Sequence, residues 1–155
     1  MNKFLLSVHV LAAIIFVGPV TVAASMFPPI ARRELAADEP AGAVLRVLHR
    51  ITRGYAIGGL TVPVFGLAVG AGLGVLGEAW LIVSMVLTAA AAGVLAVVVL
   101  PGQSEIVAAV DGDPALRESL VGRARSLSMK TGVFGLLWAT VVVLMIIRPG
   151  STTGV

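Results

Sequence analysis

Hydrophobic residues along this chain form four long uncharged stretches, separated by shorter segments rich in arginine. The stretches cover residues 4–31, 54–77, 79–104 and 131–147 and are 17 to 28 residues long. A helix of roughly 17 to 25 apolar residues crosses the hydrocarbon core of a bilayer, where a charged side chain is costly. The apolar runs are continuous and lack the alternation typical of barrel strands. The pattern therefore predicts an all-α integral membrane four-helix bundle with spans at about residues 4–27, 55–77, 79–101 and 131–147.

Two segments between these spans are amphipathic and predict two short cytoplasmic helices at the membrane surface. In residues 41–53, three arginines share one helical face, while leucine and valine cover the remainder. We interpret Arg46, Arg50 and Arg53 as contacts to anionic lipid headgroups or to a partner protein. The second helix is predicted to begin with Asp113 as N-cap and Pro114 at the first helical position. The chain is then one four-span domain over residues 1–148, with a loose tail at 149–155.

The charges predict an orientation in the membrane. The chain has 11 Lys and Arg residues, and all but two lie in the connections 28–53 and 101–130. Because cytoplasmic loops carry an excess of these residues, we expect both connections in the cytoplasm and both termini outside. A net charge of +3 then reflects topology, and we expect no nucleic-acid partner. The excess of Arg over Lys, with abundant Ala, Gly and Val, is typical of a bacterial protein, which places the chain in a bacterial plasma membrane.

Composition narrows the fold class and the chemistry further. Apolar residues make up 58% of the chain and charged residues 12%, which excludes an ordinary water-soluble fold. Cysteine is absent, so disulfides, thiolate nucleophiles and cysteine-ligated metals are excluded. The first stretch has the flanks of a signal peptide, and we expect it to be retained as a span.

Small residues in the second span predict a close helix contact. Glycines recur every four residues, interrupted only by Val62, and the packing candidates among them are Gly58, Gly66, Gly70 and Gly74. Such a row lets another helix backbone approach closely. The partner is either the chain's own third helix, where residues 89–93 form a similar smooth patch, or another subunit. Pro19 and Pro63 should kink or locally open the helices that contain them.

His9 is the only ionisable residue inside a predicted span and is the principal candidate site residue. Three interpretations compete: a neutral histidine hydrogen-bonded to a neighbouring helix, an axial ligand to haem, or part of a proton or metal-ion path. Met85 and Met145 are predicted at the same depth as His9, which makes them candidates for a second haem ligand. His49 is predicted at the opposite boundary, so it cannot share an iron with His9. We expect no catalytic set and no metal site.

The first span resembles a known group of proteins. Residues 7–18, with the sequence SVHVLAAIIFVG, and the following pair Arg32–Arg33 are similar to the first helix of small bacterial membrane proteins of the CopD-like and HemJ-like type, mostly of unknown function. The HemJ-like resemblance implies haem b bound through His9 and the oxidation of protoporphyrinogen. The CopD-like resemblance implies copper handling. This chain differs from both in having Phe16 where tryptophan is common and no further histidine within a span.

Two functional hypotheses follow from these patterns. The first is a non-catalytic accessory or structural subunit that packs against a larger membrane complex, such as a respiratory complex, or against copies of itself, and binds no cofactor. The alternative is a haem b-binding redox protein, or a HemJ-like protoporphyrinogen oxidase, with His9 as axial ligand. We favour the first hypothesis because active sites usually need several converging polar groups, and the spans contain one histidine with scattered hydroxyls.

Overall fold

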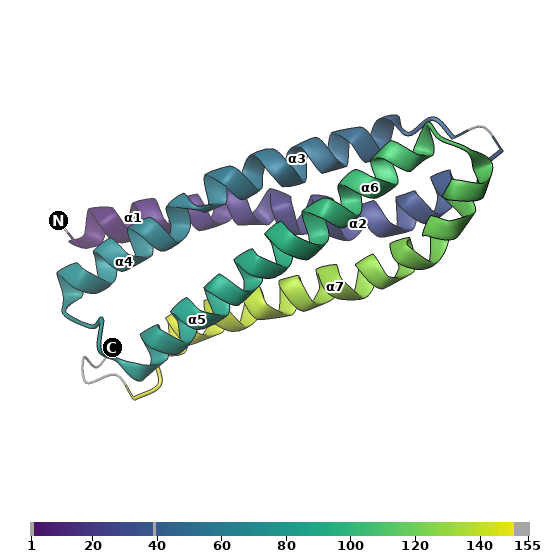
Figure 1. The fold of residues 1–155 in the computed structure, drawn as a ribbon. Helices are drawn as coiled ribbons and strands as arrows, with labels where there is room; N and C mark the ends of the chain where they lie inside the picture. The colour runs from purple at the N-terminus through teal and green to yellow at the C-terminus, as the bar shows by residue number, and fades with distance from the viewer. Residues whose placement is uncertain (1, 39, 151–155) are drawn as a thin grey trace.

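Residues 2–38 and 40–150 form four long helical segments, here called rods, that lie side by side (Figure 1). Each rod runs antiparallel to the next one along the chain. A computed structural model describes residues 2–38 and 40–150, and every regular element in that part of the chain is helical. Seven α-helices and two π-helical segments make up the four rods. The first rod contains α1 (Asn2–Ala12), η1 (Ala13–Val17) and α2 (Gly18–Leu35); the second contains α3 (Ala43–Gly59) and α4 (Thr61–Leu73); the third contains α5 (Ala79–Gly93), η2 (Val94–Val99) and α6 (Leu100–Val110); and the fourth is α7 (Pro114–Ile147).

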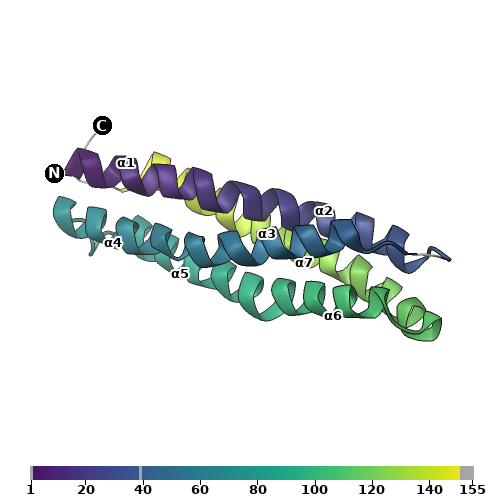
Figure 2. The same cartoon turned by 90° about the horizontal axis from the view of Figure 1, so that it is seen from above.

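Different pairs of helices pack against each other at the two ends of the bundle. At the end where α1 begins and α7 stops, α1 packs on α4 and α5 packs on α7 (Figures 1 and 2). At the other end, α2 packs on both α3 and α7, and α6 packs on α7 and α3. The turn between α4 and α5 lies at the same end as the beginning of α1 and the end of α7 (Figure 1).

Each rod is long and apolar enough to cross a membrane, and each is longer than the crossing requires. The four rods that meet these criteria are 31 to 34 residues long. At 1.5 Å per residue this is about 46–51 Å, whereas the hydrocarbon core is about 30 Å thick. The residues in excess of the membrane-crossing length include most of the Lys and Arg residues of the chain. We call residues 27–35, 43–53, 102–110 and 114–130 the arginine-rich end. The remainder of the four rods we call the span region.

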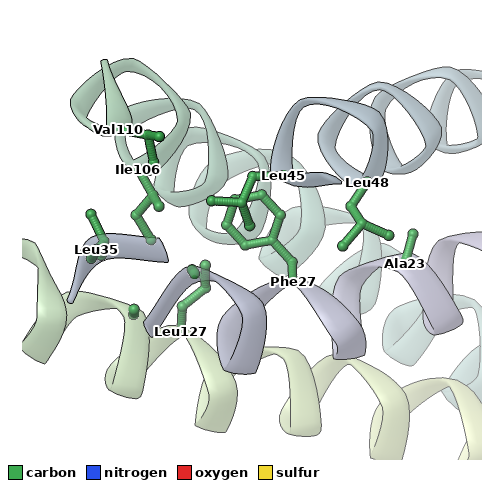
Figure 3. Close-up of a cluster of buried hydrophobic side chains, with 10 residues drawn as sticks. Ala23, Phe27, Leu35, Leu45, Leu48, Ile106, Val110 and Leu127 are labelled. Atoms are coloured by element: carbon green, nitrogen blue, oxygen red, sulfur yellow. The ribbon is translucent and has the colours of Figure 1, made fainter. Parts of the chain in front are cut away.

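A hydrophobic core fills the arginine-rich end, although its surface is charged. Phe27, Leu45 and Ile106 are completely buried there and come from α2, α3 and α6 (Figure 3). Leu127 of α7 joins the same cluster. Inward apolar and outward charged positions are the pattern of a water-exposed helix bundle. The arginine-rich end therefore has a buried apolar core and carries most of the Lys and Arg residues, together with exposed apolar side chains such as Val47 and Met129.

The two amphipathic segments are not shown as separate surface helices, which corrects the expectation from sequence. Residues 43–53 are the first part of α3, and residues 114–127 are the first part of α7. Leu45 and Leu48 have exposed fractions of 0% and 7% and belong to the same buried cluster as Phe27. An amphipathic pattern shows that one face is apolar but not whether lipid or protein covers that face. Here protein covers it.

In the span region, by contrast, large apolar side chains point away from the bundle. Phe4, Val64 and Leu136 are mostly exposed, although smaller buried clusters hold the rods together. Such a surface suits lipid, which offers apolar side chains a favourable environment.

Prolines mark the irregular points of the rods. The π-helical η1 ends directly before Gly18 and Pro19, and the second rod is interrupted at Leu60, three residues before Pro63. Proline lacks the N–H that would bond to the carbonyl four residues earlier, which explains both irregularities and agrees with the expected local opening. The predicted start of α7 is confirmed, because the Asp113 carboxylate accepts a hydrogen bond from the Ala115 N–H at 2.8 Å, with Pro114 first in the helix.

Candidate functional site

His9 lies on α1 and is hydrogen-bonded to the backbone of α4. Its Nδ1 is 2.9 Å from the carbonyl oxygen of Val62, and its side chain is half-buried. A carbonyl oxygen can only accept, so Nδ1 carries the proton and donates. In the neutral ring, Nε2 is then the nitrogen with a free lone pair. The structure thus has the arrangement of a histidine bonded to a neighbouring helix. The same tautomer is used by metal-ligating histidines, whose second nitrogen is held by a carbonyl or carboxylate.

The glycine row of the second rod forms the surface on which α1 lies. A Cβ atom added at Gly66 would be 2.9 Å from Cε1 of His9, and one added at Gly58 would collide with the ring of Phe16. The sequence left the partner of this row open between the third helix and another subunit. In the structure the first rod covers Gly58 and Gly66, so this part of the row is not available to another protein.

The two remaining packing glycines have different surroundings. A Cβ at Gly70 would be 2.9 Å from a methyl group of Leu81 on α5 and 3.0 Å from one of Leu76. Gly74 ends α4 with a φ of +70°, a conformation that favours glycine, and nothing lies within 4 Å of its Cβ position. Gly74 therefore acts as a helix cap and not as a packing position.

The two methionine candidates lie in other surroundings than His9. Met85 on α5 is 40% exposed on the outside of the bundle. Met145 on α7 packs against the cluster formed by Val75, Trp80 and Leu81, near the turn between α4 and α5. His9 instead lies in the contact between α1 and α4. Because His9 and the two methionines have different neighbours, these side chains do not form a pair of haem ligands.

The serine and threonine hydroxyl groups of the span region are all bonded within their own rod. Each donates to a backbone carbonyl three or four residues earlier, at 2.7 to 2.9 Å. The residues are Ser7, Thr21, Ser25, Thr61, Ser84, Thr88, Thr131 and Thr140. Such bonds satisfy the hydroxyl locally. These polar groups therefore do not converge on a common point, as the groups of an active site would.

A small apolar cavity lies among all four rods near the interruption at Leu60. Its volume is about 70 Å³, and its walls include Phe16, Tyr55, Pro63 and Trp138. Sites for organic ligands usually have volumes of about 300–1,000 Å³. His9 is not among the residues that line this cavity. The cavity therefore does not fit a haem group ligated by His9.

The three arginines predicted to contact lipid or a partner lie on the surface of the arginine-rich end. Arg46 forms an ion pair with Asp111, with 3.0 Å between Nη1 and Oδ2, and also donates to the carbonyl of Ala41. Arg50 and Arg53 are exposed. Arg46 therefore links the start of α3 to the end of α6, whereas the other two remain accessible.

A buried polar network in the arginine-rich end was not anticipated from sequence. Gln103 of α6 is fully buried, and its Oε1 lies 3.2 Å from Nδ1 of His49 on α3. Its Nε2 donates to the hydroxyl of Thr52 at 3.5 Å, and that hydroxyl donates to the carbonyl of Leu48. A buried amide requires partners on both of its polar atoms. The only sequence signal was a glutamine near the end of a long apolar stretch, which does not identify its partners.

Metal binding has no obvious basis in residues 2–38 and 40–150. Within these ranges, no group of three or more His, Asp or Glu side chains could hold an ion together.

Arg117, which is nearly buried, donates from Nη1 to the carbonyl of Ala37 at 3.0 Å and so ties α7 to the connection after α2. Arg117, like Arg46, thus connects separate segments of the arginine-rich end.

Comparison with known proteins agrees with the architecture. No curated protein and no solved structure matches the chain. A protein family described as "Predicted integral membrane protein (DUF2269)" matches residues 3–149, which include all four rods. This description supports a membrane protein of unknown function and does not extend to the CopD-like or HemJ-like type. The four membrane-length rods and this match together place the chain in the family of predicted integral membrane proteins designated DUF2269.

Proposed function

We propose that this chain is a non-catalytic accessory or structural subunit that packs against a larger membrane complex. The arrangement of polar groups supports this proposal. The serine and threonine hydroxyls of the span region are bonded within their own rods, and His9 is bonded to the carbonyl of Val62. The cavity among the rods is small and apolar. A bundle with these properties can present a surface to a partner but has no assembled chemical centre.

The observation that carries the proposal is an uncovered surface of small residues on the third rod. We define this small-residue surface as Ala89, Ala90, Gly93 and Ala96, all of which are exposed. Nothing lies within 4 Å of the Cβ position of Gly93. The chain covers Gly58 and Gly66 with its first rod but leaves this second smooth surface open to the membrane. Helices in lipid associate through close backbone approach at such residues, so a transmembrane helix of the partner complex is the occupant that fits.

Replacing Gly93 by leucine should therefore weaken association without disturbing the bundle. The new side chain would enter open space in the isolated chain but would hold a partner helix away. We expect the amount of partner protein that co-purifies from native membranes in mild detergent to fall about tenfold, equivalent to a loss of about 1.4 kcal/mol.

Gly132→Leu is the matched control, because Gly132 is also exposed and has an open Cβ position, but on α7. It should leave co-purification unchanged. Equal losses in both variants, or a wild-type chain that purifies alone, would contradict the proposal. If the wild-type chain purifies as a defined oligomer and the Gly93→Leu variant does not, the partner is another copy of this chain and not a larger complex.

Haem b binding through His9 is the second candidate, and one observation favours it. The bond to Val62 leaves Nε2 of the neutral imidazole with its lone pair. The cavity does not fit the group, so haem would have to lie on the lipid-facing side of α1 and α4. The absorption spectrum of the same purified sample distinguishes the candidates, because a Soret band that disappears in His9→Ala would favour haem over the accessory role.

We also propose that the arginine-rich end lies in the cytoplasm of a bacterial cell, with both termini outside. The support is the positive-inside rule, applied to the nine Lys and Arg residues in residues 28–53 and 101–130. A cysteine introduced at Val47 would then react with a membrane-impermeant maleimide in opened cells but not in intact ones. Reaction in intact cells would show that the arginine-rich end lies outside the cell.

A further inference from the structure

A second cavity lies between the third rod and α7, where the span region meets the arginine-rich end. Its volume is about 190 Å³. Val97, Val98 and Leu127 provide apolar walls, and Arg123 and Lys130 provide the charged side. Unlike the cavity near Leu60, this one combines apolar and cationic groups. The combination matches a molecule with an anionic head and a hydrocarbon tail.

The shape of this cavity follows from the local sequence of the third rod. Pro101 has no N–H to donate to the carbonyl of Val97, and the helix widens into the π-helical η2 over Val94–Val99. Directly afterwards, Gly102 allows α6 to lie close to α7, since a Cβ at this position would be 3.1 Å from Leu127. The cavity thus lies beside a widened segment and next to a tight helix contact.

The depth of the cavity coincides with the edge of the apolar stretches. Lys130 directly precedes the uncharged residues 131–147, and Pro101 lies where the third span is predicted to end. Val97, one turn earlier, is largely exposed toward the membrane. Phospholipid headgroups lie at this level, with their acyl chains extending toward the bilayer centre. The cationic side of the cavity is therefore at headgroup depth and its apolar side at acyl-chain depth.

The charge of the cavity is positive after its internal ion pair is counted. Arg123 is paired with Glu105, with 2.8 Å between Nη2 and Oε2, which orients the guanidinium. More than half of the Arg123 side chain remains exposed, so its other N–H groups can bind a second acceptor. Lys130 is exposed and has no carboxylate partner within residues 2–38 and 40–150. One net positive charge thus faces the cavity.

We propose that this cavity is a binding site for an anionic phospholipid. The lipid phosphate is held by Arg123 and Lys130, and one acyl chain lies along Val97 and Val98. Basic pockets between transmembrane helices at headgroup level bind anionic lipids in this way. The cavity shares no residue with the small-residue surface, so the site goes beyond the accessory role and would exist in either functional candidate.

The test measures lipid binding to the purified full-length chain in detergent by native mass spectrometry. Phosphatidylglycerol is titrated in parallel with phosphatidylcholine of the same acyl chains and with inorganic phosphate. We expect phosphatidylglycerol to bind most tightly, and Lys130→Gln to weaken its binding about fivefold, the effect typical of one basic residue near a membrane surface. Lys130→Arg should restore binding because it keeps the charge.

Two further variants distinguish a site from general surface attraction. Arg53→Gln removes an exposed cation that does not line the cavity, and it should change binding less than about twofold. Val98→Phe fills the cavity at unchanged charge and should also lower phosphatidylglycerol binding. Equal losses in Lys130→Gln and Arg53→Gln would overturn the proposal. Equal binding of phosphatidylcholine, or displacement of the lipid by equimolar inorganic phosphate, would overturn it as well.

Discussion

Replacing Gly66 by leucine is expected to separate α1 from α4 and to lower the free energy of unfolding by about 2–4 kcal/mol. Overpacking a tight contact costs about 1–3 kcal/mol, and the loss of a hydrogen bond adds about 1 kcal/mol. Both apply here, because a Cβ at Gly66 would already be 2.9 Å from the imidazole of His9, whose Nδ1 donates to Val62. The measurement is an unfolding titration of the purified chain in mixed micelles.

Gly132→Leu serves as the control for this prediction as well. It makes the same exchange at a helical glycine but places the new side chain where nothing lies within 4 Å. Its stability should stay within about 0.5 kcal/mol of the wild-type value. If Gly66→Leu were as stable as Gly132→Leu, α1 would not lie on the glycine row, and the placement of His9 would be wrong.

Replacing Phe27 by alanine is the second large effect and concerns the arginine-rich end. Phe27 is fully buried at the centre of its core, between residues of α2, α3 and α6. Truncating a buried phenylalanine costs about 3–5 kcal/mol. We expect this loss in the same titration, together with faster amide hydrogen exchange in residues 43–53 and 102–110, which would lose their common packing partner.

Phe4→Ala is the matched control, since Phe4 is 70% exposed on the outside of α1. Removing its ring deletes contacts with lipid or detergent and leaves no cavity in the protein, so stability should change little. A small effect of Phe27→Ala, comparable to that of Phe4→Ala, would show that the arginine-rich end has no common core.

The sequence correctly indicated four helices long and apolar enough to cross a membrane, because charge is strongly excluded from the hydrocarbon core. The uncharged stretches and the cap at Asp113 depend on local chemistry, which residue types reveal directly. The partner of each surface was not predictable in the same way. Helical periodicity placed Leu45 and Leu48 on one face but could not show that Phe27, rather than lipid, covers them.

The candidate site illustrates the same limit. His9 stood out as the one ionisable residue in a span, yet its partner is a backbone carbonyl, which every residue possesses. The glycine row predicted a close helix contact without identifying the helix, and the structure shows the first rod at Gly58 and Gly66 and Leu81 of α5 at Gly70. Gln103 was inconspicuous, although it joins α3 to α6 through His49 and Thr52. Long-range pairing of this kind requires three-dimensional information.

We infer that the rods continue beyond the membrane as a bundle with its own core. Because the chain contains no cysteine, spin labels can be attached at single introduced cysteines along α3 and α4 in reconstituted vesicles. Oxygen concentrates in lipid and a nickel chelate in water, so their relaxation effects report each label's surroundings. We expect a label at Val47 to be accessible to nickel, one at Val64 to oxygen, and those at Leu45 and Leu48 to neither. Oxygen accessibility at Leu45 and Leu48 would instead place this segment in lipid, and the rods would then not continue beyond the membrane as a bundle.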